Sequence, residues 1–148
     1  MKLYKSTLCE LQLKRVDTSY QRAKISSSKD GEKYFRNFFF EDLTIYESFF
    51  LLTLNNANNT TGYVKISQGG ITGTLVDMRI VLKYAIENLA TSIMVCHNHP
   101  SGNINPSEAD KQLTKKLKNA VESVDIKLLD HIILTEESYY SFADEGLL

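Results

Sequence analysis

The sequence predicts an α/β (α+β) fold in which a mixed, mostly antiparallel sheet is flanked by helices. The chain has 148 residues, of which 43% are hydrophobic and 24% charged, and these values are typical of one compact domain. Its apolar residues repeat with the two-residue period of strands in some segments and with the period of helices in others. No linker or repeat separates these segments in the sequence, so we expect a single domain over residues 1–148.

The first 46 residues are expected to form an N-terminal extension made of one strand and one helix. Residues 8–16 alternate apolar and polar side chains, as a half-buried edge strand does, and residues 18–28 are a polar connection. Ser27 or Ser28 can cap a helix that runs to about Phe40. The aromatic face of this helix would consist of Tyr34, Phe35, Phe38 and Phe39.

Residues 47–148 are expected to form the core of the domain, which begins with a hairpin. Residues 48–54 are apolar on both alternating faces, which is typical of a central strand covered on both sides. Residues 55–59 have turn chemistry and lead to a second strand near residues 61–67. After a loop with Gly69, Gly70 and Gly73, residues 77–90 predict a helix whose apolar stripe contains Met78, Val81, Leu82, Ala85 and Leu89.

The second half of the core repeats the order of strand, loop and helix. Residues 92–96 form a short apolar strand that ends abruptly in the polar run from His97 to Asn103. Residues 107–124 predict a helix, and residues 126–135 and 139–142 predict two further strands. The helix would bury Leu113, Leu117, Ala120, Val121 and Val124 and expose Lys111, Lys115, Lys116 and Lys118.

Charge and composition exclude several classes of protein. The formal net charge is −1, so no overall positive field attracts nucleic acid. No segment has the ~20 apolar residues of a membrane span and the N-terminus lacks a signal-peptide core, so we expect a cytoplasmic protein. In that compartment Cys9 and Cys96 are expected to be reduced and buried, without a disulfide.

The chemistry of the sequence concentrates in residues 97–110. His97 and His99 are two residues apart on an extended segment, so their imidazoles project to the same side and form half of a zinc site. Asp110, one turn into the following helix, can supply a third ligand. Two histidines and one carboxylate leave the fourth position of a tetrahedral zinc open to water, which is the arrangement of catalytic sites.

The same residues fit other interpretations as well. Ser107 and Asp110 also form a capping-box pattern, which by itself is more often structural than functional. His131 follows Asp130 in an apolar run, which favours a core or supporting histidine over a fourth ligand. Cys96 continues an apolar strand and is interpreted as core rather than as a nucleophile. The letters His-Asn-His lack the longer spacing of the nucleases named after them.

Taken together, the motif resembles a known family. His97-x-His99-Pro100, followed by seven residues to Ser107 and two more to Asp110, is similar to the signature of the JAMM metalloproteases, also called MPN or JAB. The string HNHPSG and the later Asp130-His131 resemble the RadC branch of that family. The similarity extends from about Glu47 to the C-terminus and includes residues 70–74 and 77–79. Residues 1–46 lack the Gly-containing helix pairs of longer RadC proteins.

The resemblance implies both an architecture and a set of roles. The fold would be the JAMM/MPN (cytidine deaminase-like) architecture, with one zinc ion held by His97, His99 and Asp110. Ser107 would support the tetrahedral intermediate, and Glu47 would act as general base. From the residues alone, an acid at the start of a buried strand is usually just its solvated end. Glu47 is preferred to Glu41, Asp42 and Glu87 because it directly precedes the central strand at the position where RadC proteins place their acid.

Three functions follow as hypotheses. The first, which the resemblance favours, is hydrolysis of an amide, peptide or isopeptide bond in a protein or peptide substrate by a metal-activated water. The second is a non-catalytic metal-binding or protein-interaction module on the same fold. The third is a DNA repair-associated role, suggested only by the RadC branch and weakened by the near-neutral charge. No membrane partner is expected, and neither the substrate nor the oligomeric state can be derived from the sequence.

Overall fold

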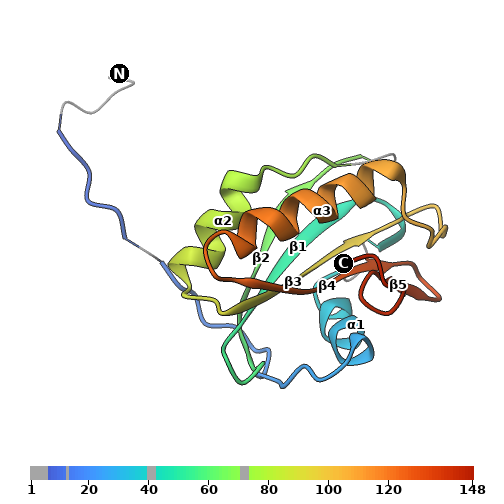
Figure 1. Ribbon diagram of the computed structural model, residues 1–148, viewed down its shortest axis with the longest axis horizontal. Coiled ribbons are helices and arrows are strands. Elements are labelled where there is room, and N and C mark those ends of the chain that lie inside the picture. Colours follow the sequence, from blue (N-terminus) through green and yellow to red (C-terminus); the bar gives the residue numbers. More distant parts are fainter. Residues whose placement is uncertain (1–6, 13, 40–42, 71–73) are drawn as a thin grey trace.

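Eight helices and strands make up the residues that this computed structural model describes, which are 7–12, 14–39, 43–70 and 74–148. Their arrangement is drawn in Figure 1. In chain order they are α1 (Ser28–Arg36), β1 (Ser48–Leu54), β2 (Thr60–Gln68), α2 (Met78–Glu87), β3 (Ser92–Asn98), α3 (Glu108–Glu122), β4 (Lys127–Leu134) and β5 (Tyr139–Ser141).

The strands form one sheet with the order β2-β1-β3-β4-β5. All neighbours run antiparallel except β3 and β4, which are parallel. A parallel pair cannot be joined by a tight turn, and α3 provides the crossover between these two strands. The predicted fold class, a mixed and mostly antiparallel sheet flanked by helices, is therefore confirmed.

The helices cover both faces of the sheet (Figure 1), with α1 on one face and α2 and α3 on the other. Successive side chains of a strand point to opposite faces, so each central strand contributes to two cores. In β3, Met94 and Cys96 pack with Phe35 of α1 and the phenylalanines that follow this helix, whereas Ile93 and Val95 pack with α2 and α3. This alternation places His97 on the α3 face of the sheet.

The two central strands are buried along their whole length. All seven residues of β1 and all seven of β3 are buried, as a strand with neighbours on both edges and helices on both faces must be. The prediction of a covered central strand at residues 48–54 is confirmed. The predicted hairpin and the later strands are confirmed as well, with shifts of one or two residues at their ends.

The prediction of an edge strand at residues 8–16 is wrong for the part of that segment that the structure describes. These residues form no strand, and the side chain of Leu11 is 90% exposed. Alternation stabilises a strand only where a sheet edge and an apolar surface receive it. Here the start of β2 is already paired on its outer side, because Lys24 forms an antiparallel bridge with Asn59.

Three helix ends differ from the predictions. Helix α1 ends at Arg36 rather than near Phe40, which itself lies outside the described residues, as does Gly73. Helix α2 ends at Glu87, and Leu89 then adopts a positive φ of 51° that removes it from the apolar stripe, leaving it 82% exposed. Val124 follows the end of α3 and is exposed rather than buried.

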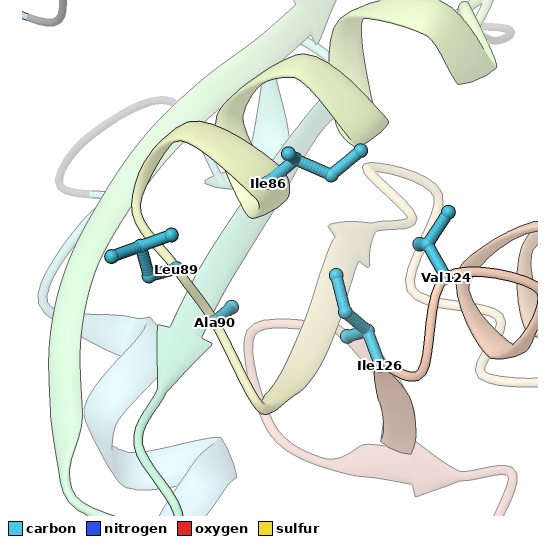
Figure 2. A pocket seen from close by; sticks show the side chains of 5 residues that line it. All are labelled: Ile86, Leu89, Ala90, Val124 and Ile126. Carbon is cyan, nitrogen blue, oxygen red and sulfur yellow. The ribbon is translucent and has the colours of Figure 1, made fainter.

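The cysteines and an apolar pocket complete the description. Cys96 is buried as predicted, whereas Cys9 is exposed because the segment that carries it is not part of the sheet. Figure 2 shows a pocket lined by Ile86, Leu89, Ala90, Val124 and Ile126. It lies where β3 and β4 begin, at the opposite end of these strands from His97. None of the described helices has the length and apolar character to cross a membrane.

Candidate metal centre

Four side chains from three parts of the chain converge at the end of the sheet where β3 finishes. Glu47 precedes β1, His97 and His99 lie at the end of β3, and Asp110 lies in the first turn of α3. One potential ligand atom from each of the four lies within 4.8 Å of the others. The structure thus brings together Glu47 and the three predicted zinc ligands in a group that could hold a metal ion.

The two histidines face each other because of the backbone of β3. His97 belongs to the strand, and the backbone N–H of His99 donates to the carbonyl oxygen of Leu134 at 2.9 Å, so the extended conformation continues past the end of β3. Residues two apart on an extended chain share a face, and the two Nε2 atoms are 3.0 Å apart. His97 is buried, whereas His99 is partly accessible.

Asp110 reaches the histidines while it also caps its own helix. Its backbone N–H donates to Ser107 Oγ at 3.0 Å, and the Ser107 N–H donates to Asp110 Oδ2 at 2.9 Å, which is a complete capping box. The same carboxylate places Oδ1 3.3 Å from His97 Nε2 and Oδ2 3.2 Å from His99 Nε2. The capping interpretation of Asp110 is therefore confirmed. The same cap holds the carboxylate beside the two histidines.

A chain of buried hydrogen bonds orients the ring of His97 and sets its tautomer. The Thr114 hydroxyl donates to the carbonyl oxygen of Asp110 at 2.7 Å, so its oxygen must accept the hydrogen of His131 Nδ1, also at 2.7 Å. Burial lowers the pKa of His131 well below its usual value, so this histidine is neutral and its Nε2 is an acceptor. His97 Nδ1 then donates to His131 Nε2 at 2.7 Å. The lone pair of His97 Nε2 is left facing Asp110 and His99.

His99 is oriented in the same way by a single backbone contact. Its Nδ1 donates to the carbonyl oxygen of Asn103 at 2.6 Å, which leaves Nε2 as the acceptor nitrogen. Two such nitrogens at 3.0 Å repel each other unless a cation lies beside them. A proton or a metal ion meets this need, and the set of two imidazole nitrogens and a carboxylate fits a divalent metal. The residues present therefore fit the zinc ion that the sequence pattern implies.

The electrostatics of the metal-free group match this geometry. Burial by itself would raise the pKa of Asp110, but the imidazoles of His97 and His99, which donate to the carboxylate when they carry a second proton, hold it far below its usual value. For His99, burial by itself would lower the pKa, but the hydrogen bonds with Asp110 and Asn103 outweigh it and the pKa is raised. The group therefore keeps an ionised carboxylate beside the imidazoles.

Glu47 lies beside the other three side chains, and its backbone is fixed. Its N–H donates to the Gly70 carbonyl at 3.1 Å, and its own carbonyl accepts the Gly69 N–H at 2.8 Å, so the β1–β2 ladder reaches one residue beyond β1. The pKa of Glu47 is raised because burial of the carboxyl outweighs the attraction of His97 and His99. A half-buried carboxyl with a raised pKa beside potential metal ligands has the chemistry to accept and return a proton.

The remaining residues show what sequence analysis found and missed. His131 lies fully buried behind His97, in the core, as the sequence predicted. Ser107 is connected to the group through Asp110. Thr114 was missed, although its position four residues after Asp110 places both on one face of α3. The carbonyl oxygen of Asn103 carries no signal in the sequence, because any residue has one.

Comparisons with known proteins identify several relatives of this chain. A relative from Flavobacterium johnsoniae, named UPF0758 protein, is 49% identical over 133 residues, which are 90% of this chain and 57% of that protein. UPF0758 proteins of Porphyromonas gingivalis and Chlorobium chlorochromatii are 34% and 43% identical over 97% and 69% of this chain. These matches cover 64% and 46% of those two proteins. The chain thus spans less than two thirds of the length of these relatives.

A family model gives the most specific assignment. The model described as RadC-like JAB domain matches residues 25–147, a range that contains all three helices and all five strands of the described structure as well as the four converging side chains. The resemblance noted from the HNHPSG motif is therefore confirmed. The chain belongs to the RadC-like JAB domain family.

Proposed function

We propose that this protein is a zinc-dependent hydrolase that cleaves an amide, peptide or isopeptide bond with water. One observation carries the proposal: hydrogen bonds orient two imidazole lone pairs toward one carboxylate, and a second carboxyl lies within 4.8 Å of the same atoms. A purely structural zinc site is closed by four tightly held ligands. Here the side chains of His97, His99 and Asp110 are fixed by hydrogen bonds, whereas the Glu47 carboxyl has no such fixed partner among the described contacts.

Zinc is the proposed ion because of the donor set. His97, His99 and Asp110 offer two nitrogens and one oxygen, which zinc accepts in catalytic sites, although ferrous iron also uses such a set. A zinc ion bound there would supply a Lewis acid, which polarises a carbonyl and lowers the pKa of a zinc-bound water to about 7. The burial of His97 and His131 would keep the site selective and poorly hydrated on the side of the core.

Glu47 is proposed to move the proton in this reaction. Its carboxylate would accept a proton from the attacking water and return it to the leaving nitrogen of the amide. The raised pKa of Glu47 favours both halves of that task, because a base with a pKa nearer to neutrality takes and gives a proton with similar ease. Ser107 is proposed to donate its hydroxyl hydrogen to the carbonyl oxygen, since its Oγ already accepts from the Asp110 N–H and retains one donor.

The substrate is proposed to be a protein or a peptide. Ile45 and Tyr46, which directly precede Glu47 in the chain, are both exposed. Apolar side chains at that position suit a polypeptide better than a phosphate-rich ligand. The net charge of −1 gives no support to nucleic acid as the substrate.

The test combines metal analysis with turnover. Protein purified without chelators should contain close to one zinc per chain, and a library of peptides and isopeptides should reveal a cleaved bond. Glu47→Gln should keep the zinc and lose about 10²- to 10⁴-fold in kcat, as removal of a general base does. Glu108→Gln is the matched control, because Glu108 is an exposed acid in the first turn of the same helix as Asp110.

Each other outcome has a definite meaning. Absence of zinc in the wild-type protein, or iron in its place, would contradict the assignment of the metal. Equal turnover by Glu47→Gln and wild type would remove Glu47 as base. Stoichiometric zinc with no cleavage of any amide would favour the alternative of a non-catalytic metal-binding module.

A further inference from the structure

Asn98 stands between the two histidines of the site but faces the opposite side of the sheet. It is fully buried, with 0% of its surface exposed. Its Oδ1 accepts the backbone N–H of Ser48 at 2.8 Å, and its Nδ2 donates to the carbonyl oxygens of Leu43 at 2.8 Å and Tyr46 at 2.7 Å. Both donor hydrogens of the amide and one acceptor position are therefore used on the backbone of a single segment.

These three contacts surround Glu47. Tyr46 immediately precedes it and Ser48 immediately follows it, and both are bound by the same amide. Leu43 lies in the short helical turn from which the chain enters β1. The backbone of Glu47 itself is bonded to Gly69 and Gly70, and Asn98 holds the residues on either side of it. Asn98 thus fixes the direction in which the segment approaches the histidines.

We infer that Asn98 is a positioning residue that sets the place of the Glu47 carboxylate relative to His97 and His99. The inference rests on the proposed function, in which Glu47 is the base. Because Asn98 belongs to the same strand as His97 and directly precedes His99, the proposed base and the proposed ligands take their positions from one piece of backbone. A displacement of the loop relative to β3 would separate the base from the group it serves.

The chemistry of the side chain explains why an amide fits this place. Aspartate offers no donor when ionised, and serine has one donor on a shorter side chain, so neither can bind two carbonyls and one N–H. An apolar residue would leave three buried backbone groups without partners, at about 1–3 kcal/mol for each. Asparagine satisfies all three contacts within one side chain.

The first test needs neither metal nor substrate. In metal-free protein, hydrogen exchange of the Ser48 amide and of peptides that cover residues 43–48 should accelerate at least about tenfold in Asn98→Ser, because the acceptor of the Ser48 N–H is lost. Exchange in Leu51–Leu54 should stay slow. Asn88→Ser is the matched control, since Asn88 Nδ2 donates to Thr53 Oγ1 at 2.8 Å at the other end of β1. Asn98→Asp, which keeps the volume of the side chain, serves if the serine variant does not fold.

The second test asks whether Asn98 acts through Glu47. Asn98→Ser should bind zinc with an affinity within roughly threefold of wild type, since the three proposed ligands are untouched. Removal of a residue that hydrogen-bonds directly to a metal ligand lowers metal affinity by more than this. Loaded with Co²⁺, Asn98→Ser and Glu47→Gln should show the same change in the visible spectrum, and Asn88→Ser should show none. In hydrolysis, Asn98→Ser should lower kcat about 10- to 100-fold alone and cost nothing further in the Glu47→Gln background.

The outcomes separate this inference from the proposed function. If no amide is cleaved, the hydrolase proposal fails, but the exchange and Co²⁺ measurements still decide the role of Asn98. Unchanged protection at Ser48, a Co²⁺ spectrum like that of wild type, or additive losses in the double variant would each overturn the positioning role. Loss of zinc together with global loss of protection in Asn98→Ser and Asn98→Asp would show that Asn98 is only structural.

Discussion

The two ends of the parallel pair β3 and β4 differ in the side chains that they carry. At the beginning of the strands, Ala90 and Ile126 line an apolar pocket whose lining contains no titratable side chain (Figure 2). At the other end, His97 contacts His99, His131 and Asp110, and the hydrogen bonds in this group extend into α3. The same two strands therefore carry packing alone at one end and ordered polar chemistry at the other.

The difference shows how a fold can support a reactive group at low cost. In α/β units, the carboxyl ends of parallel strands face the N-terminus of the crossover helix, where orphan backbone groups need polar partners. Asp110 and Ser107 bind these backbone N–H groups of α3, and the same contacts place a carboxylate beside His97. At the beginning of the strands, backbone N–H groups such as those of Ala90 and Ile126 bind the last carbonyls of α2 and α3, and hydrophobic side chains fill the space. Four predictions test this contrast.

The largest effect is expected from removal of a proposed ligand. His97→Ala and Asp110→Ala should each lose zinc binding by far more than the about 100-fold that a supporting residue costs. Ile126→Ala, in the apolar pocket, should leave zinc binding unchanged although it lowers stability by about 2–5 kcal/mol. Calorimetric titration of the metal-free variants with zinc measures zinc binding, and urea unfolding measures the stability of Ile126→Ala. Stoichiometric zinc in His97→Ala would contradict the ligand assignment.

The next effect concerns Thr114, which supports the site without touching the metal. Thr114→Val keeps the shape of the side chain but removes the acceptor of His131 Nδ1, so zinc affinity should fall about 10- to 100-fold. The free energy of unfolding should fall by about 1–3 kcal/mol, because a buried donor loses its partner.

Thr53→Val is the control for this experiment. Thr53 is also buried, and its Oγ1 contacts Thr61 Oγ1 at 2.9 Å and the Gly62 carbonyl at 3.1 Å, toward the far end of β1. It should lower stability by about 1 kcal/mol and leave zinc affinity unchanged. Equal zinc affinities for the two variants would show that the buried chain behind His97 has no influence on the metal.

The third prediction is a pH dependence of the metal-free protein. The pKa of His99 is raised above 6.5 in the folded protein, so its contribution to stability is complete below pH 6.5 and is lost as the pH rises through the folded value. The pKa of His131 is lowered, so its contribution is complete above pH 6.5 and is lost as the pH falls toward the folded value. Together these two histidines predict maximal stability near pH 6.5.

Urea unfolding across this range, in the presence of a chelator, measures the effect. His99→Gln should flatten the alkaline side of the profile and leave the acid side, since only the raised pKa is removed. Asp110 works in the same direction as His131 at lower pH: its lowered pKa stabilises the protein above pH 3.8, and that contribution is lost as the pH falls below it. An alkaline side that remains unchanged in His99→Gln would contradict the pairing with Asp110.

The smallest effect is expected at the apolar end. Leu89 follows α2 with a φ of 51° and is 82% exposed, so its side chain gains little burial at a position that favours glycine. Leu89→Gly should raise the free energy of unfolding by about 0.5–1 kcal/mol, because relief of left-handed strain exceeds the added entropy of the unfolded chain. Leu75→Gly, at a leucine that is 91% exposed and has no positive φ, should give no gain. Differential scanning calorimetry decides between the two.

Most of the sheet and the helices could be predicted because their signals are local. Continuous burial of residues 48–54 follows from an apolar run on both faces, and the start of α3 follows from Ser107 and its capping partner. The pair of histidines could be predicted as well, since a spacing of two on an extended chain places both side chains on one face. Residues 8–16 show the limit of local signals, because their alternation is real but no sheet edge receives it.

The sequence by itself determined the strands, the caps and the pairing of His97 with His99, because each depends on residues close together in the chain. Only the tertiary structure decided that Glu47 lies beside them, that His131 and Thr114 orient His97, and that Asn98 binds both neighbours of Glu47. These contacts join residues 17 to 63 positions apart. They are set by strand order and by the α3 crossover, which no local pattern specifies.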